Sequence, residues 1–158
     1  MVIGVGCDIM LLSSVREESL LENAPFYERV FTEREKKEGR ARGISGTYFR
    51  TRFCGKEAVM KALHMDGNLV RLNEIEILCS QIGEPQVFLH GTVKKHAANR
   101  KIENIFLSLS YDGAYAMAYA VAESNMQQNT MYEGRNDVRF NSEFNCKGET
   151  ESKAGCFS

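Results

Sequence analysis

The chain lacks several features that would place it in other protein classes. Its five cysteines include no C-x-x-C pair, and its three histidines show no metal-ligand spacing. An odd number of unclustered cysteines argues against a disulfide framework and favours a reduced, cytoplasmic protein. The formal net charge of −1 gives no overall case for a nucleic-acid or membrane partner.

Long apolar runs are also missing. No segment approaches the ~20 apolar residues of a membrane-spanning helix, and Asp8 interrupts the first apolar segment before it could serve as a signal peptide. A chain of this length can bury one core without disulfide or metal support. We expect that core in a single domain over residues 1–124. Residues 125–158 are polar and are expected to form a flexible tail.

The N-terminal segment alternates with period two, which predicts a strand. Its two faces are Ile3, Val5, Cys7 and Ile9, and Gly4, Gly6 and Asp8. Two bare glycines followed by a carboxylate leave room for a close approach to the second face. A strand end with a solvated aspartate would explain the same residues.

Helical patterns follow this strand. Ser14 with Glu17 and Thr32 with Glu35 have the spacing of capping boxes, so both pairs predict helix starts. Capping accounts fully for Thr32 and Glu35. A third helix is expected over residues 46–64.

The sequence pattern predicts mostly strands in the second half of the domain. "NEIEIL" and "QVFLH" alternate and are joined by a turn with Gly83 and Pro85; a helix over 91–101 follows. Asp112-Gly113 predicts a hairpin between the last two strands. These elements describe an α+β domain with a mostly antiparallel sheet and helices packed on it.

The stretch "CGKEAVMKAL", residues 54–63, has an unusual distribution of charge. If this stretch is helical, apolar side chains cover two parts of its surface and leave two narrow strips for the charged residues. One strip carries Arg52 and Lys56 and the other carries Glu57 and Lys61, each pair spaced i, i+4. Two surface pairs would explain them, a Glu-before-Lys pair contributing roughly 0.2–0.5 kcal/mol. A functional site would explain them as well, and the stretch alone leaves both possibilities open.

Five motifs lie in register over residues 2–123: "GVGCDIM", "RFCGKEAVMKAL", "NEIEI", "GEP" and "LSLSYDGAYAMAYAVAE". Together they resemble the holo-acyl-carrier-protein synthase family of 4′-phosphopantetheinyl transferases. The resemblance implies that family's fold and transfer of 4′-phosphopantetheine from coenzyme A to a serine of an apo acyl carrier protein, releasing adenosine 3′,5′-bisphosphate. The residues do not distinguish a carrier of fatty acid biosynthesis from one of polyketide synthesis.

The resemblance also implies roles for individual residues. Asp8 and Glu57 match the family's metal-binding carboxylates, which suit Mg²⁺ or Mn²⁺ at a phosphate site. Glu57 or a metal-bound water would accept the serine proton, and Lys61 would stabilise or protonate the leaving oxygen. Family members are commonly homotrimers with sites between subunits, where the N-terminal strand and central helix of different chains meet.

Further positions match those that face coenzyme A in the family. Gly83 and Pro85 fit a Gly-x-Pro turn beside the adenine end. The full set of expected cofactor contacts is Arg52, Lys56, Gly83, Pro85, Ser110 and Tyr111. Charge complementarity makes Arg16, Arg29 and Arg34 candidates for docking an acidic carrier, although each could equally be a solvated residue.

The chain departs from the family pattern at three places. Tyr111 stands where a histidine is usual, "HMDGN" replaces a Gly-rich loop, and Leu11 and Ser14 replace an acidic and a basic residue. Asp8, Glu57 and Lys61 are spared, which favours an active transferase with altered cofactor affinity or carrier choice. The alternatives are a catalytically impaired homologue that binds a carrier protein or a nucleotide, and an unrelated metal-dependent phosphohydrolase.

Overall fold

The structure is a computed structural model that describes residues 1–42, 45–68 and 70–124. The expected tail at 125–158 lies outside the described residues. The helices are α1 (Pro25–Val30), α2 (Glu33–Ala41), α3 (Ser45–Ala62) and α4 (Gly91–Asn99), with 3-10 turns η1 (Leu12–Ser14), η2 (Glu17–Leu20) and η3 (Leu72–Glu74). The strands are β1 (Val2–Leu11), β2 (Ile75–Cys79), β3 (Pro85–Leu89), β4 (Asn104–Asp112) and β5 (Tyr115–Glu123).

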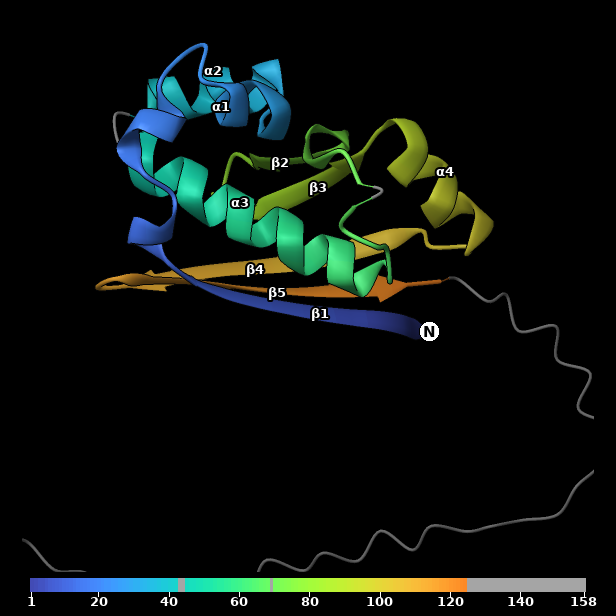
Figure 1. The fold of residues 1–158 in the computed structure, drawn as a ribbon. Helices are drawn as coiled ribbons and strands as arrows, with labels where there is room; N and C mark the ends of the chain where they lie inside the picture. Colours follow the sequence, from blue (N-terminus) through green and yellow to red (C-terminus); the bar gives the residue numbers. More distant parts are fainter. Residues whose placement is uncertain (43–44, 69, 125–158) are drawn as a thin grey trace, which may run out of the picture. The chain divides into compact units, whose positions relative to one another are not determined.

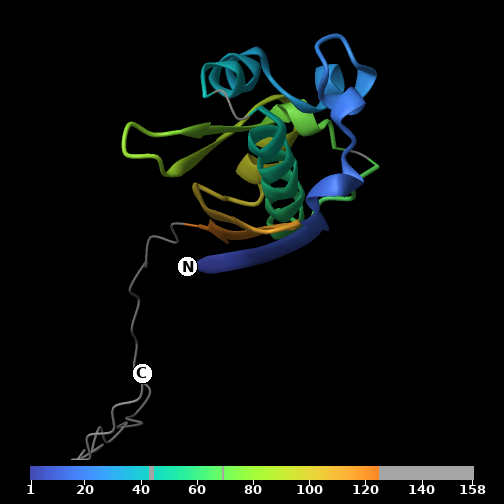
Figure 2. The ribbon, with the colours of Figure 1, turned by 90° about the vertical axis from the view of Figure 1, so that its left-hand side faces the viewer.

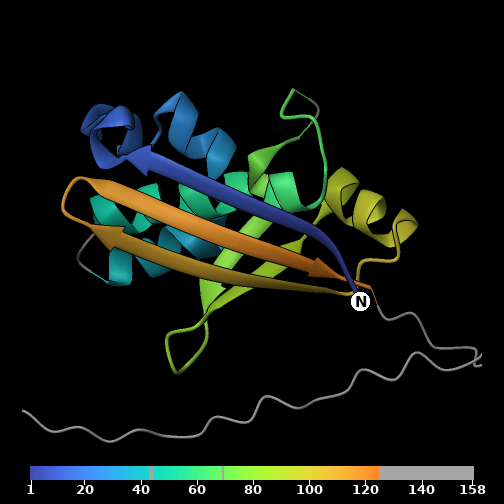
Figure 3. The same ribbon diagram turned by 90° about the horizontal axis from the view of Figure 1, so that it is seen from below.

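These strands form two antiparallel sheets, one of three strands in the order β1-β5-β4 and one of two strands, β2-β3. Helix α3 lies between the two sheets and covers one face of the three-stranded sheet (Figures 1 and 2). Seen from the other side, the outer face of that sheet carries none of the described helices (Figure 3). The α+β class and the antiparallel pairing are as predicted, but the strands form two sheets rather than one.

Small residues allow α3 to approach the sheet closely. The alternate residues Ala116, Ala118, Ala120 and Ala122 of β5 face α3 and are at most 1% exposed. In β1 the same face carries Gly4 and Gly6, where a Cβ atom would collide with the carbonyl oxygens of Ala62 and Ala58. The close approach expected at this glycine face is therefore made by α3 itself.

One local prediction was wrong. Ser14 and Glu17 do not open an α-helix: residues around them form η1 and η2, and the Ser14 hydroxyl donates a hydrogen bond to Leu11 O at 2.5 Å. The predicted hairpin between the last two strands is present, and it turns at Gly113 and the residue after it, because Asp112 still pairs with Tyr115 in the ladder.

The predicted capping box of Thr32 and Glu35 opens α2. Pro25 occupies the first turn of α1, where its missing N–H is not needed. Within the described ranges, no helix combines the length and the apolar character needed to cross a membrane.

A substitution at Gly6 tests the helix–strand contact. Gly6→Ala should lower the free energy of unfolding by about 3 kcal/mol, the upper end of overpacking costs, because the opposing atoms belong to the α3 backbone and cannot rotate away. Chemical denaturation would measure this. Gly67→Ala is the control: its Cβ would lie 3.5 Å from the flexible Met60 Cε, so the expected change is within about 0.5 kcal/mol. Equal stabilities for the two variants would show that α3 does not hold β1 this tightly.

Candidate functional site

Asp8 and Lys61 form an ion pair where β1 crosses α3. The Lys61 Nζ lies 2.8 Å from Asp8 Oδ1 and donates a second hydrogen bond to Cys7 O at 2.9 Å. Lys61 is 48% exposed, so its ammonium group is accessible to a ligand. The hydrogen bond to Asp8 is the main cause that raises the pKa of Lys61. Lys61 thus pairs with a residue of β1 rather than with Glu57, its i, i−4 neighbour.

Glu57 is the second carboxylate of this site. Its side chain is partly buried, and burial followed by the negative charge of Asp8 raises its pKa, while Lys61 partly opposes the shift. The positive charge of Lys61 therefore does not fully offset the cost of burying the Glu57 carboxylate beside Asp8. Among the described residues, no group of three or more His, Cys, Asp or Glu side chains converges as a metal site. Any ion here would have to complete its coordination with water and substrate oxygens.

Cys54 of α3 contacts the backbone of β1 at Asp8. Its thiol donates to Asp8 O at 3.4 Å and lies 3.7 Å from Ala116 O, so it links β1, β5 and α3. Burial raises the pKa of Cys54 to about 12, which keeps the thiol protonated and unreactive.

Lys56 does not face a ligand site, contrary to the sequence-based prediction. It is fully buried, and its Nζ donates to Glu35 Oε2 at 2.8 Å and to the carbonyl oxygens of Val30 and Leu72 at 2.7 and 3.0 Å. Three acceptors require the ammonium form. Burial lowers the pKa of Lys56 and the charge of Glu35 opposes this shift. Lys56 is therefore a structural cation that joins α3 to the end of α1 and to η3.

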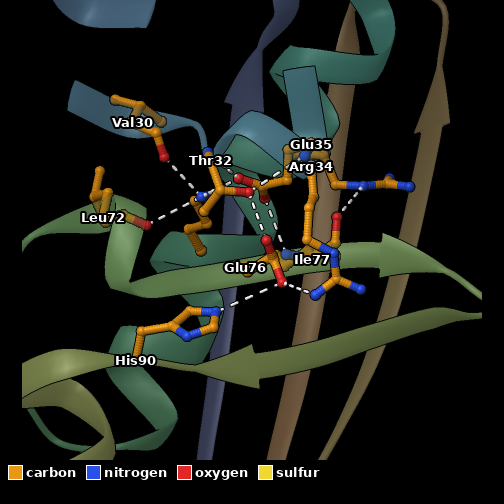
Figure 4. A network of polar contacts seen from close by, with 10 residues as sticks. Val30, Thr32, Arg34, Glu35, Leu72, Glu76, Ile77 and His90 are labelled. Carbon is orange, nitrogen blue, oxygen red and sulfur yellow. Dashed lines mark hydrogen bonds and ion pairs between the residues drawn. The ribbon is translucent and has the colours of Figure 1, made fainter. Parts of the chain in front are cut away.

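Figure 4 shows the polar network that surrounds this pair. Besides Lys56, Glu35 accepts hydrogen bonds from the backbone N–H groups of Thr32 and Ile77. The Thr32 hydroxyl continues the network to the buried Glu76, which also pairs with Arg34 at 2.7 Å. Capping therefore explains only part of what Thr32 and Glu35 do. Arg34, expected as a free candidate for carrier docking, is engaged by Glu76.

Four of the expected cofactor residues line one pocket of about 270 Å³: Arg52, Gly83, Pro85 and Tyr111. Two contacts fix the Arg52 side chain: its Nε donates to Ile77 O at 3.1 Å, and its guanidinium carbon lies 4.4 Å from the Tyr48 ring centroid. Gly83 has a φ of +90°, which a glycine adopts without strain at the β2–β3 turn.

Ser110 lies apart from this pocket. It pairs in register with Met117 on the outer face of the three-stranded sheet, whereas its neighbours Leu109 and Tyr111 line the pocket on the other face. Alternation along β4 thus separates Ser110 from the expected cofactor contacts.

The pocket and the Asp8 site lie on opposite sides of α3. Lys61 follows Arg52 by about two and a half helical turns, so the two side chains leave the helix in opposite directions. Lys61 contacts β1, one edge of the three-stranded sheet, while the Arg52 pocket includes Leu109 and Tyr111 of β4, the other edge. Apart from Lys56 and Ser110, the expected site residues therefore form two separate halves in one chain.

Comparison with known proteins identifies the family of this chain. The family model described as the 4′-phosphopantetheinyl transferase superfamily matches residues 4–120. The chain belongs to this superfamily. A holo-[acyl-carrier-protein] synthase of Clostridium perfringens is 34% identical over 134 residues, which cover 82% of this chain and 99% of the relative. The family suggested by the five motifs is thus confirmed.

Solved structures of the superfamily share the fold. The holo-[acyl-carrier-protein] synthase of Neisseria meningitidis superposes with a TM-score of 0.70 at 28% identity, covering 78% of this chain and all of that one. A Chronobacterium ammoniagenes ACPS–CoA complex superposes with a TM-score of 0.65 at 26% identity, covering 77% of this chain and 96% of that one.

Sequence reasoning missed several residues of both halves. Cys54 was not connected to Asp8, and Glu38, Arg42, Thr47, Tyr48, Thr51 and Cys79 were not connected to the pocket. The i, i+4 spacings of Glu38 with Arg42 and of Tyr48 with Arg52 were the available signals. Contacts from β2 and β4 could not be found from local spacing.

Removing the ammonium group of Lys56 tests its structural role. Lys56→Met should lower the free energy of unfolding by about 3–5 kcal/mol, because Glu35 would remain buried without its partner. Urea denaturation would measure this, and adding Glu35→Gln should recover part of the loss. Lys36→Met is the matched control, since Lys36 is also buried but pairs with the more exposed carboxylates of Glu28 and Glu33; the expected loss is about 1 kcal/mol or less. A Lys56→Met protein with wild-type stability and weakened coenzyme A binding would restore the original prediction.

Proposed function

We propose that this chain transfers 4′-phosphopantetheine from coenzyme A to a serine hydroxyl of an apo acyl carrier protein. The observation that carries the proposal is the convergence of Asp8, Glu57 and Lys61 in a member of the 4′-phosphopantetheinyl transferase superfamily. Relatives named holo-[acyl-carrier-protein] synthase align with most of the chain and along nearly their whole length.

The reaction replaces a phosphoanhydride bond of coenzyme A by a phosphate ester bond to the carrier serine. The serine oxygen attacks the phosphorus that bears the pantetheine arm, the pyrophosphate bond breaks, and adenosine 3′,5′-bisphosphate leaves. Such a transfer depends on alignment and charge neutralisation more than on covalent help from the protein. The pKa of Glu57 is raised towards neutral pH, which makes its carboxylate a better base for the serine proton than an ordinary glutamate. The exposed ammonium group of Lys61 is available to stabilise the charge that develops on the leaving oxygen.

Asp8 and Glu57 fit a divalent cation. Both offer hard carboxylate oxygens, their mutual repulsion contributes to the raised pKa of Glu57, and Asp8 already holds the ammonium cation of Lys61. We assign them as the residues that would hold Mg²⁺, or Mn²⁺ in its place. The bound ion would neutralise phosphate charge and lower the pKa of a coordinated water.

The outer face of the three-stranded sheet supports self-association. It exposes a cluster of apolar side chains that are 44–65% accessible: Val5, Ile9, Leu11, Phe106, Tyr115, Met117 and Tyr119. Apolar surface of this kind is typical of an interface with another protein chain. We propose that copies of this chain cover it in a homotrimer, as the family resemblance suggested.

Self-association would also complete the active site. The pocket with Arg52 and Tyr111 lies across α3 from Asp8, so one coenzyme A molecule would meet the pocket of one copy and the Asp8 site of the next. Within one chain, Asp8 of β1 contacts Lys61 of α3. The proposed shared site therefore joins the catalytic half of one copy and the nucleotide half of the next.

The acidic carrier is expected to dock on exposed basic side chains. Arg16 lies at the start of η2, and Arg29 lies on α1, where its Nε donates to Pro25 O. With Arg34 held by Glu76, Arg16 and Arg29 are the better candidates for the docking surface.

A mass measurement tests the proposed activity. The chain, coenzyme A, Mg²⁺ and an apo acyl carrier protein are incubated, and intact-mass spectrometry should show phosphopantetheine on the carrier. Asp8→Asn, Glu57→Gln and Lys61→Met should each slow transfer by about 100-fold or more, since acid–base groups contribute on this scale. Chelation of the metal should stop it, and Glu103→Gln, at an exposed carboxylate before β4, should leave it unchanged.

Two results would overturn the proposal in different ways. Carriers that stay unmodified while the folded chain binds coenzyme A or carrier without metal would identify a binding homologue. Release of free phosphopantetheine to water would identify a phosphohydrolase.

A further inference from the structure

A groove lies where α4 connects β3 to β4, and it shares no lining residue with either half of the proposed site. β3 and β4 are edge strands of the two separate sheets, and no strand of the described residues lies between them. The groove has a volume of about 460 Å³, which is within the range of small-molecule sites.

Most of the groove lining is apolar. Helix α4 buries Val93 and Ala97 in the core, and the next residue after each of them, Lys94 and Ala98, lines the groove. The strands and the segment after α4 contribute apolar side chains that extend the main core to the surface: Val87, Leu89, Ile102 and Ile105. All four are only partly buried. A ligand with an apolar body would therefore remove further apolar surface from water here.

Lys94 supplies the positive charge that is available in this groove. It is exposed and, within the described ranges, takes part in no ion pair. His90, the other basic residue of the lining, lies 3.5 Å from the Glu76 carboxylate (Figure 4). The acidic residue of the lining, Glu103, lies beyond the C-terminal end of α4, whereas Lys94 lies in the first half of the helix. An anionic group is therefore favoured at the Lys94 end.

The N-terminus of α4 itself is not available to an anion. Glu74 accepts the backbone N–H groups of Thr92 and Val93 at 2.7 and 3.1 Å. Recognition of a negative charge at this end of the groove therefore depends on the side chain of Lys94.

We propose that the groove binds a medium-chain carboxylate, whose carboxylate pairs with Lys94 and whose alkyl chain lies on Val87, Leu89, Ile102 and Ile105. This binding function is separate from the proposed transfer. A strongly polar ligand such as a sugar would leave hydroxyl groups unpaired against the apolar lining. An alkyl chain with a cationic head would be repelled by Lys94.

Equilibrium dialysis of the full chain against radiolabelled decanoate tests the site. Affinity should rise at least two-fold per methylene from hexanoate to decanoate, because each added group is removed from water. Lys94→Gln should weaken decanoate binding about five-fold, the upper end for an exposed ion pair, and leave binding of 1-decanol within about two-fold. Lys95→Gln is the matched control, because Lys95 is the adjacent exposed lysine and does not line the groove.

A second pair of variants tests the position of the alkyl chain. Ala98→Phe should fill the groove and weaken binding of both decanoate and 1-decanol about ten-fold or more. Ala98 is exposed, so the larger side chain adds no strain to the core. Asn99→Phe, at the next exposed residue and outside the lining, should keep the wild-type affinities. Thermal unfolding followed by circular dichroism would verify that both variants fold.

Each contrary result overturns a defined part of the proposal. Decanoate binding that survives Ala98→Phe would place the ligand elsewhere, such as on the outer face of the three-stranded sheet. Equal effects of Lys94→Gln and Lys95→Gln, or equal affinity for decanoate and 1-decanol, would overturn the role of Lys94. Absence of saturable decanoate binding by the wild-type chain would overturn the site as a whole. The proposed transfer is tested separately by the mass measurement.

Discussion

The contact between α3 and the glycine face of β1 is the constraint on which the rest of the structure depends. Gly4 and Gly6 let the helix backbone lie directly against the strand, and the alanines of β5 continue this small-residue surface. Asp8 is the next residue on that face, so the same approach brings its carboxylate within 2.8 Å of Lys61. The site is therefore a consequence of backbone packing, and any side chain at these glycines would move the carboxylate away from the helix.

A second constraint fixes the other side of α3. The buried Lys56–Glu35 pair and its neighbours Thr32 and Glu76 join α1, α2, η3 and β2 to the central helix. A buried ion pair adds little net stability over an apolar pair, but it tolerates only one arrangement of its partners. The network therefore fixes the helix turn that carries Glu57. It also explains why Lys56 and Lys61, five residues apart on α3, have unrelated roles: Lys56 is held inside this network, whereas Lys61 lies at the Asp8 site.

Much of the fold was predictable because its signals are local. Strand alternation, the capping box of Thr32 and the order of elements are properties of short segments, and the five motifs indicated the family. The partner of Lys56 was not predictable, because Glu35 had a sufficient local explanation as a capping residue. Ser110 and Tyr111 were grouped through the family resemblance, although adjacent residues of a strand point to opposite faces. The pocket could not be assembled from sequence, since Glu38, Arg52 and Cys79 meet only through tertiary packing.

In the proposed assembly, α3 separates a catalytic half from a nucleotide half, and neighbouring copies reunite them. Mixed oligomers test this most directly. Asp8→Asn disables the first half, and Tyr111→Glu, at a residue that is 59% exposed, places a negative charge in the second. Subunits of the two variants, carrying different tags, are exchanged and the mixed oligomers purified. At a coenzyme A concentration where each variant alone is inactive, the account predicts that the mixed oligomers regain phosphopantetheine transfer. Mixed oligomers as inactive as their parents would show that each site is built within one chain.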